Sequence, residues 1–570
     1  MCGIGFALCL GKCNELPSGG CSHHVLDEST LNLMRRRGPD QWNTVSLLVP
    51  VGTGLSVNVH LWAAVLSLRG NESSEQPVKG PGGILCFNGE IYSGLYVPPE
   101  MSDTAVLIES LSSSSSPSAV AQLVSSLRGP WAFVYVCQKS RKIYFGRDIF
   151  GRRSLLIRRT TCGFQLTSVA HEHQLGENRW EELPAQGVYI YDMLVSSWTL
   201  MQWDRTPSGS TIHNVSSCAA LHDVPLATEH LTSPIEVALQ RTPSTRLVSI
   251  QGSAVDVFGV LLDVYEKEVA AFHDALHKAI KRRVENISKR FTDIPVGILF
   301  SGGIDSTVIA AIALRSFPDV AFELINVAFE HRDSQGQPSF NTPDRRTSIE
   351  AFKELEALDG VEISKARLLC VDVSYVELQR ARAGLHVSRL IHPMNTVLDD
   401  SLGFALWFAA RGHGYDYKTT KRYENRSKVL LLGMGADEQL GGYSHHAASF
   451  KDCSWSSLGN CIAMDMDRIS CRNLGRDDRV LADLGKESRA PFLDEDLVSF
   501  LNGLPLDAKM GLNQPRNVGD KLILRLLAYK INLRETAQRA KKALQFGSKI
   551  AHVDPKRNKG HIICNRFEKH

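Results

Sequence analysis

The segment between residues 296 and 315 places the strongest constraint on how this chain can fold. The apolar run over residues 296–300 predicts a buried strand, the Ser301-Gly302-Gly303 turn follows it, and residues 306–315 have the composition of a helix. Further buried-type strands are predicted over residues 323–329, 368–373 and 429–432. Strands that alternate with helices form a parallel sheet covered on both faces, so this half of the chain is predicted to be an α/β domain.

The first half of the chain has a different pattern, because short β-type runs are separated by Gly, Pro and Ser. Strands are predicted over residues 83–87, 131–137, 142–145 and 188–191. A chain of 570 residues exceeds the size of a single core, so two or three domains are expected, of α+β and then α/β class. We expect a β-rich domain over residues 2–190, a linker or peripheral segment over 206–260, an α/β domain over 261–552 and a basic tail over 553–570.

Charge and apolar runs argue against two classes of partner. Lys and Arg total 64 against 61 Asp and Glu, so the net charge of +3 gives no case for nucleic acid or an anionic membrane. The most apolar run, residues 402–410, is far too short to cross a bilayer and predicts a buried helix. We see no signal peptide, and the thirteen cysteines lack the spacing of a disulfide framework, so a cytoplasmic location is predicted.

Cys2 directly follows the initiator Met, so removal of Met1 gives one residue both a thiol and a free α-amine. An α-amine titrates at about 7.7–8.0 and can act as the base that a thiol nucleophile needs. The side-chain amide of Asn88 and the backbone N–H of Gly89 are predicted oxyanion donors, and Asp103 is predicted to bind a substrate ammonium group. Taken singly, each motif has a structural alternative, because Asn-Gly is a common tight-turn dipeptide.

The order of these motifs resembles that of the class II, or N-terminal nucleophile, glutamine amidotransferases over residues 2–190. The resemblance implies a four-layer αββα sandwich in which the terminal Cys attacks the carboxamide of glutamine and releases ammonia. The matching motifs also make Arg37 and Glu90 predicted substrate-binding residues. One departure is serious, since Val65 stands where the family usually has the Arg that binds the glutamine carboxylate, and Arg69 lies on a different register.

The run Ser301-Gly302-Gly303-Ile304-Asp305-Ser306 is suited to binding a phosphate group. Glycines let the backbone approach an anion closely, and N–H groups at the start of a helix face it. The Lys and the spacing of the ordinary phosphate loop are absent, and a bare Ser-Gly-Gly turn can also be purely structural. The signature resembles the pyrophosphate loop of ATP pyrophosphatases, which cleave ATP to AMP and pyrophosphate, and an acidic residue there suits a bridging Mg²⁺.

The run from Gly433 to Tyr443 resembles the second loop of asparagine synthetases. The implied ATP-binding residues are Leu299, Ser301, Gly302, Gly303, Asp305, Ser306, Val327 and Gly433, and the implied Mg²⁺ ligands are Asp305 and Asp437. Lys541 or Lys542 is implied to neutralise charge as an acyl-adenylate forms. Met434 replaces the Glu that is thought to act as a base for ammonia, and a missing general base typically costs about 10²–10⁴-fold in rate.

A terminal-Cys glutaminase followed by a Ser-Gly-Gly-Ile-Asp-Ser domain resembles glutamine-hydrolysing asparagine synthetase over nearly the full chain. The resemblance implies glutamine, aspartate and ATP as substrates, with ammonia displacing AMP from β-aspartyl-AMP. Two alternatives stay open: a degenerate enzyme that keeps ATP or protein binding, and an adenylating enzyme with another acid or amine. The sequence also leaves open a homo-oligomer or a protein partner.

His445 and His446 follow the second loop. They are therefore close in sequence to the predicted phosphate site, which favours a role there. We interpret them as solvent-exposed loop residues.

Overall fold

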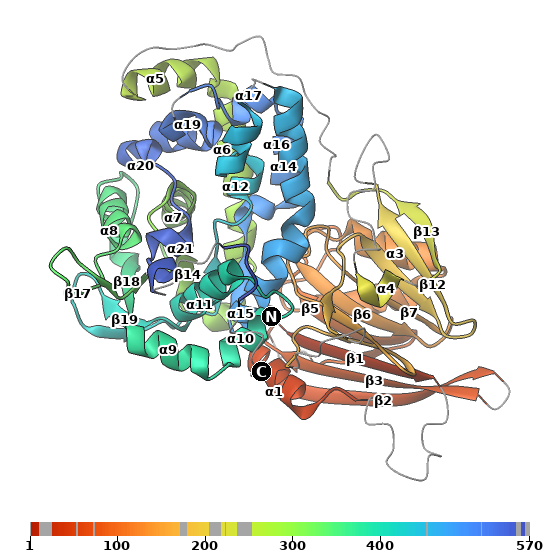
Figure 1. Cartoon of the computed structure of the whole chain (residues 1–570). Coiled ribbons are helices and arrows are strands. Elements are labelled where there is room, and N and C mark those ends of the chain that lie inside the picture. Colours follow the sequence, from red (N-terminus) through yellow and green to blue (C-terminus); the bar gives the residue numbers. More distant parts are fainter. Residues whose placement is uncertain are drawn as a thin grey trace.

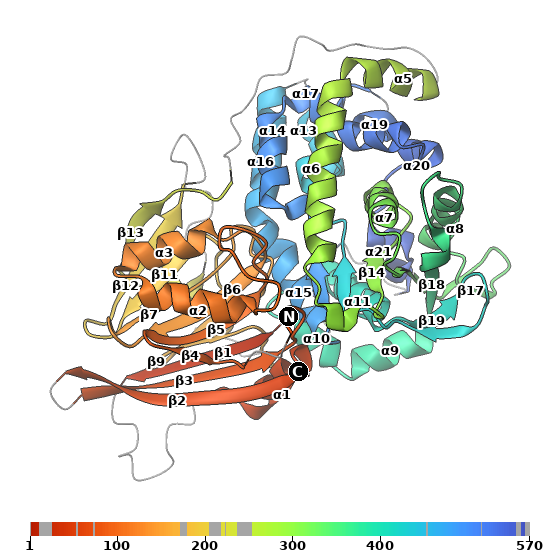
Figure 2. The same cartoon turned by 180° about the vertical axis from the view of Figure 1, so that it is seen from behind.

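The computed structural model divides into a β-rich part and a largely helical part that lie side by side (Figure 1). It describes residues 2–10, 25–52, 55–71, 75–171, 179–204, 218–222, 224–235, 254–451, 454–514, 516–553 and 560–564. The view from behind shows the same division, with the long helix α6 (Glu266–Glu285) running along the helical part (Figure 2).

The β-rich part consists of two mainly antiparallel sheets packed face to face. The first has the order β10-β8-β9-β1-β3-β2, with bounds Glu181–Glu182, Leu156–Thr160, Gly163–Thr167, Gly3–Leu10, Leu55–Val65 and Gln41–Gly52. The second has the order β13-β12-β11-β7-β6-β5-β4, with bounds Leu226–Leu231, Ser197–Trp203, Gly187–Asp192, Lys142–Arg147, Trp131–Cys137, Gly83–Gly89 and Val78–Gly80. Buried side chains from both sheets, among them Phe6, Leu61, Val134 and Phe145, form one core between them.

Helices cover the outer faces of both sheets. Helix α1 (Glu28–Arg37) packs on β1 and β3, α2 (Asp103–Ser113) packs on β4 and β5, and α3 (Pro117–Ser126) packs on β11. Each helix begins at a capping side chain, because Asp27, Ser102 and Ser116 accept a hydrogen bond from the backbone N–H three residues later. The layer order confirms the predicted αββα sandwich.

The second sheet continues beyond the expected domain end at residue 190. Strand β12 pairs with β11, and β13 pairs in parallel with β12, so residues 226–231 of the segment expected as a linker or peripheral segment form the edge of this sheet. Most β13 side chains are exposed because it is an edge strand, which explains its weak apolar pattern. Residues 205–217 and 236–253 lie outside the described residues.

The helical part is built around a seven-stranded sheet. Its order is β20-β19-β18-β15-β14-β21-β22, with bounds Arg422–Glu424, His413–Asp416, Ala366–Val373, Phe322–Phe329, Val296–Leu299, Val429–Leu431 and Glu487–Arg489. Strands β18, β15, β14, β21 and β22 are parallel, while β19 and β20 add an antiparallel edge. The predicted parallel α/β sheet is therefore confirmed.

Side chains that alternate along the strands supply two cores, one on each face of this sheet. Phe322 and Leu324 of β15 pack in the core that holds α6 and α7 (Ile304–Ser316), whereas Ile325 and Val327 pack in the core that holds α11 (Val397–Arg411). The predicted buried helix over residues 402–410 lies within α11. In the part of the chain that the structure describes, none of the helices combines the length and apolar character needed to span a bilayer.

The strand order reverses at β14, which has β15 on one side and β21 on the other. In open α/β sheets, ligands bind outside the carboxyl ends of the strands at such a reversal. The Ser301-Gly302-Gly303 turn follows β14 and the Gly433–Tyr443 loop follows β21, so the fold brings both predicted nucleotide loops to the same point.

Part of the predicted basic tail is docked on α11. The backbone N–H groups of Val397 and Leu398 donate to the carbonyl oxygens of Ile562 and Gly560 at 3.0 and 2.9 Å. These bonds satisfy donors that the first turn of a helix otherwise leaves unpaired. Residues 554–559 and 565–570 of the tail are not among the described residues.

Buried ion pairs join the two parts of the molecule. Arg152 of the β-rich part pairs with Glu495 of the helical part and also lies 2.9 Å from Oδ1 of Asp148. Nη2 of Arg37 lies 2.7 Å from Oδ2 of Asp478 in the helical part. Since charges removed from water need partners, these contacts hold the two parts together as one unit.

We expect Arg152→Ala to lower the free energy of unfolding by about 3–5 kcal/mol, because two buried carboxylates lose their cation. Denaturant unfolding followed by circular dichroism measures the change. The control is Lys281→Ala, which removes an exposed pair with Glu285 on α6 and should change stability by less than about 0.5 kcal/mol. Equally small effects of both substitutions would contradict the expectation.

Candidate active sites

Cys2 lies at the start of β1 and packs into the core between the two sheets. It is 7% exposed, and its backbone N–H donates to Oδ1 of Asn88 at 2.8 Å. Its Sγ atom lies 3.6 Å from Nε2 of Gln76, and burial raises the pKa of the thiol. The structure therefore brings the predicted nucleophile into contact with a predicted oxyanion residue from the opposite sheet.

Asn88 is fully buried in β5, and its Nδ2 has no hydrogen-bond partner within the described residues. A buried amide donor left without a partner costs free energy, so this group is available to an acceptor from a ligand. Gly89 follows it, and a Cβ there would lie 2.2 Å from the carbonyl oxygen of Pro130. Close packing thus requires glycine at this position, whatever its role in catalysis.

Asp103 opens α2 and is paired with Arg69. Its Oδ1 accepts from Nη1 of Arg69 at 2.8 Å and from the backbone N–H of Ile91 at 3.2 Å. Burial raises the pKa of Asp103 to about 6, against the opposing effect of Arg69. Sequence reasoning missed this ion pair, because nothing in the motif shows where Arg69 points. Val65 is 1% exposed and packs between the sheets, so its position supplies no charge.

Arg37 and Glu90 face the helical part of the molecule. Nη2 of Arg37 donates to Oδ2 of Asp478 at 2.7 Å, and its Nε donates to the carbonyl oxygen of Cys2 at 3.3 Å. Oε1 of Glu90 lies 3.5 Å from Nη2 of Arg489. Burial and a neighbouring carboxylate raise the pKa of Glu90 to about 8. Both residues therefore connect the surroundings of Cys2 with the second domain, and their substrate-binding role stays a prediction.

The predicted pyrophosphate loop has a backbone that requires glycine. Gly302 has a φ of +74°, and a Cβ there would lie 2.4 Å from the backbone of Thr347. Oγ of Ser301 accepts from the backbone N–H of Gly303, the residue that caps α7, at 3.2 Å. Oγ of Ser306 donates to the carbonyl oxygen of Gly303 at 3.2 Å. The loop therefore leads directly into a helix N-terminus, where backbone N–H groups favour an anion.

Asp305 and Asp437 converge on the ammonium group of Lys521. Its Nζ lies 2.6 Å from Oδ2 of Asp305 and 2.7 Å from Oδ1 of Asp437. Nζ of Lys541 lies 3.1 Å from Oδ2 of Asp437. Carboxylate oxygens are the ligands that Mg²⁺ prefers, so the donor set fits the predicted metal. Sequence reasoning missed Lys521, because it stands outside both loops, immediately before α19 (Leu522–Lys530).

The other predicted residues of this site lie around the same point. A Cβ on Gly433 would lie 2.9 Å from Cβ of Asp305, so the two loops touch. Leu299 ends β14, and Val327 is buried in the neighbouring β15. Burial raises the pKa of Asp344 to about 7, against the opposing effect of the positive charge of Lys542.

A cavity of about 20 Å³ is lined by side chains from both parts of the molecule. They include Tyr92, Arg152, Arg283, Met434, Leu474 and Arg489. A volume of this order holds roughly one water molecule, and ammonia is of similar size. Met434 therefore lines the space between the two domains without offering a group that accepts a proton.

His445 and His446 lie on α13 (Ser444–Ser449). The interpretation as exposed loop residues is wrong for His446, which is fully buried, while the side chain of His445 is 42% exposed. Their shared partner, Asp465, follows them by 20 and 19 residues and stands on a different helix, α14 (Trp455–Ile469), so the local pattern did not reveal it.

A class II glutamine amidotransferase sandwich followed by an adenine-nucleotide-hydrolase-like α/β domain is the class of protein that this fold and these sites define. Residues 63–172 match the family model "glutamine amidotransferase domain". Residues 271–459 and 451–559 match the family model "asparagine synthase". The chain belongs to the asparagine synthase family, whose synthase domain uses ATP.

The similarity to known relatives extends over nearly the whole chain. The chain is 35% identical to asparagine synthetase domain-containing protein 1 of Mus musculus, covering 95% of this chain and 97% of that protein. It is 36% identical to the protein of the same name from Homo sapiens, covering 95% of each. It is 34% identical to asparagine synthetase domain-containing protein CG17486 of Drosophila melanogaster, covering 94% of this chain and 95% of that protein.

We expect Glu90→Gln to make stability less dependent on pH. The folded pKa of Glu90, about 8, lies above its ordinary value of 4.5, so between these values the folded protein binds more protons than the unfolded chain. The wild type therefore loses stability as pH rises through this range. The variant lacks this loss, so its free energy of unfolding rises relative to that of the wild type. Denaturant unfolding at several pH values measures the difference, with exposed Glu109→Gln as the control. If the difference in the free energy of unfolding between Glu90→Gln and the wild type stays constant between pH 4.5 and pH 8, the expectation is wrong.

Proposed function

We propose that this protein is an ATP-dependent amidotransferase of the asparagine synthetase type. It hydrolyses glutamine at Cys2, and the ammonia amidates aspartate that ATP has activated in the second domain. The observation that carries the proposal is the convergence of Asp305 and Asp437 beside a glycine loop at the reversal of the sheet. Such a place suits a nucleotide and its cation.

In the first domain, the thiol of Cys2 attacks the carboxamide carbon of glutamine. After removal of Met1, the α-amine of Cys2 takes the thiol proton and later protonates the leaving ammonia. Nδ2 of Asn88, buried without a partner among the described residues, donates to the developing oxyanion. Asp103 receives the substrate ammonium group, and its pairing with Arg69 fixes the carboxylate in place. Water then releases glutamate from the thioester.

In the second domain, the side-chain carboxylate of aspartate attacks the α-phosphorus of ATP, and pyrophosphate leaves. The loop from Ser301 to Ser306 holds the phosphates at the start of α7. Asp305 and Asp437 would hold a Mg²⁺ ion, which when bound would supply positive charge beside the phosphates. Lys521 and Lys541 lie beside the same carboxylates and add further neutralising charge. Ammonia then attacks the acyl-adenylate, and AMP leaves.

A second candidate function, ATP binding without catalysis, is favoured by two residues of the chain. Val65 and Met434 both replace charged residues of the family, one at the glutamine carboxylate and one beside the ammonia acceptor. A chain altered in this way can keep ATP binding without turnover. The two functions differ in whether pyrophosphate appears, which is directly measurable.

We expect the purified protein to release pyrophosphate from Mg·ATP in the presence of aspartate and an ammonia source. Asp305→Asn should reduce this release by about 10²-fold or more, because the pyrophosphate charge loses a ligand to its cation. Cys2→Ala should remove the glutamine-dependent release and keep the ammonium-dependent release. Coupled enzymatic detection of pyrophosphate and chromatography of amino acids measure both products.

The matched control for Cys2→Ala is Cys471→Ser. Cys471 is exposed and lies outside the loops over residues 301–306 and 433–443. Its glutamine-dependent and ammonium-dependent rates should equal those of the wild type. ATP binding without pyrophosphate release for any amino acid would refute the ligase and leave the nucleotide-binding scaffold. Unchanged glutamine dependence in Cys2→Ala would refute the glutaminase alone.

We expect Met434→Glu to increase asparagine formation from ammonium by roughly 10²-fold, because it returns a general base to the loop. The effect should fall on amidation and leave the first turnover of aspartate-dependent pyrophosphate release, measured without an ammonia source, within about twofold of the wild type, since formation of the acyl-adenylate needs no such base. Met434→Gln, which has the same length without a basic group, is the control. Equal rates for the two variants would show that a base at this position does not limit the reaction.

A further inference from the structure

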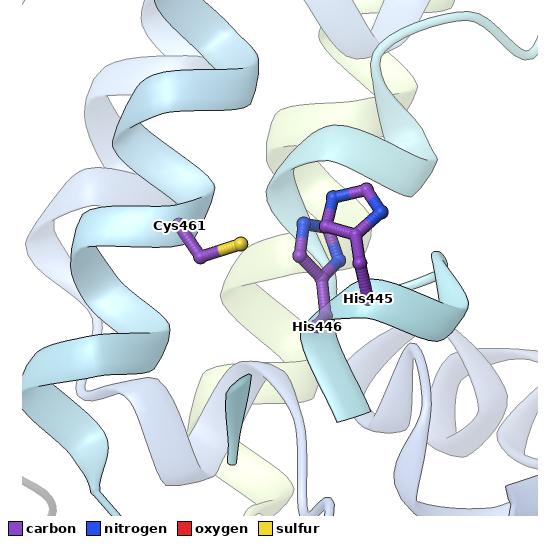
Figure 3. Close-up of side chains that lie close together, drawn as sticks. All are labelled: His445, His446 and Cys461. Carbon is purple, nitrogen blue, oxygen red and sulfur yellow. The ribbon is translucent and has the colours of Figure 1, made fainter. Parts of the chain in front are cut away.

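A group of metal-ligating side chains lies outside both sites already described. His445 and His446 stand side by side on α13, and Cys461 stands on the facing helix α14. Figure 3 shows the two imidazole rings next to each other and the sulfur of Cys461 directed toward them. One ligand atom from each of the three residues lies within 4.8 Å of the others.

A carboxylate lies against the two imidazoles of this group. Asp465 follows Cys461 by one turn of α14, and its Oδ2 lies 2.6 Å from Nε2 of His445 and 3.0 Å from Nε2 of His446. The carboxylate is 3% exposed, so it is held between the two imidazoles and away from bulk water. Two ring nitrogens that meet at one carboxylate oxygen form the arrangement that a cation can occupy in place of the ring protons.

We propose that His445, His446, Cys461 and Asp465 form a site for one zinc ion. Two imidazole nitrogens, one thiolate and one carboxylate oxygen are a donor set that zinc accepts in tetrahedral geometry. The thiolate and carboxylate together balance the charge of a divalent ion. Thiolate and imidazole donors exclude Mg²⁺ and Ca²⁺ as preferred occupants, so this site differs in kind from the one at Asp305 and Asp437.

The geometry requires small movements only. Zinc–nitrogen bonds of about 2.0–2.1 Å and zinc–sulfur bonds of about 2.3 Å place tetrahedral ligand atoms roughly 3.5 Å apart. The ligand atoms of His445, His446 and Cys461, now within 4.8 Å of one another, therefore have to approach, while Oδ2 of Asp465 has to move slightly away from the two imidazole nitrogens. Coordination through Nε2 leaves the proton of His446 on Nδ1. The long 3.4 Å contact from the backbone N–H of Tyr443 to that atom then gives way. The partly exposed His445 provides the route by which the ion enters.

Zinc at this position links two helices next to the second nucleotide loop. Helix α13 directly follows Tyr443, whose ring lies 4.4 Å from Nζ of Lys541. The ion therefore ties the end of that loop to α14 through four side chains. Its binding is independent of the proposed function, because none of its ligands contacts Asp305 or Asp437 in any described hydrogen bond or ion pair.

The test is metal content and spectroscopy of the full chain. After dialysis against zinc and gel filtration, plasma mass spectrometry should find one zinc per wild-type chain. The cobalt-substituted protein should show the near-ultraviolet absorption of a cobalt–thiolate bond. Cys461→Ser should lose that band and weaken zinc binding by more than roughly tenfold, while Cys471→Ser, at an exposed position outside the cluster, should keep both.

The variant Asp465→Asn tests whether Asp465 binds the metal or only accepts hydrogen bonds from the two imidazoles. It keeps the size of the side chain, and we expect it to weaken zinc binding by about 10–100-fold without abolishing the thiolate band. Circular dichroism checks that each variant is folded, and zinc should raise the melting temperature of the wild type but not of Cys461→Ser. A wild type that retains no zinc, or a thiolate band unchanged in Cys461→Ser, would overturn the proposal.

Discussion

The structure depends first on buried charge that is neutralised across the boundary between its two domains. Arg37 and Arg153 of the β-rich domain are at most 1% exposed, and their carboxylate partners Asp478 and Glu487 belong to the other domain. Burial opposes ionisation of Asp478, yet the charges of Arg37 and Arg153 hold its pKa below the usual range. Neither domain can bury its own members of this network without the other, because an unpaired buried ion costs several kcal/mol.

This network also fixes the place of the N-terminal pocket relative to the second domain. Arg37 contacts the carbonyl oxygen of Cys2 and Asp478 at the same time, so one guanidinium joins the proposed nucleophile to the synthetase domain. Glu90 and Arg489 make a second connection close by. Arg489 also lines the small cavity between the two domains, so these charge pairs lie beside it.

The two departures from the family pattern have a common physical character. Val65 packs into the core between the sheets, and Met434 contacts apolar side chains of both domains. Each of these side chains makes apolar contacts where the family resemblance implies a charge, so neither position carries the desolvation cost of a buried charge. Arg69 brings a guanidinium near the pocket from another register, but the structure commits it to Asp103 and to two backbone carbonyls. The proposed nucleotide site shows no comparable change, since Asp305, Asp437, Lys521 and Lys541 meet at one point.

The sequence by itself determined the elements and the class of the fold. Strand and helix periodicity predicted strands of the second β-rich sheet and of the parallel sheet, and glycine positions such as Gly302 predicted a loop, because these signals are local. It also grouped Cys2 with Asn88 and Asp305 with Asp437, and each pair is close together in the structure. Only the tertiary structure decided what these residues contact. Lys521, Arg69 and Asp465 carry no motif, and edge strand β13 has no apolar pattern, so their roles arise from contacts between segments distant in sequence. Long-range pairing of charges follows from packing, and a single sequence contains no local signal of it.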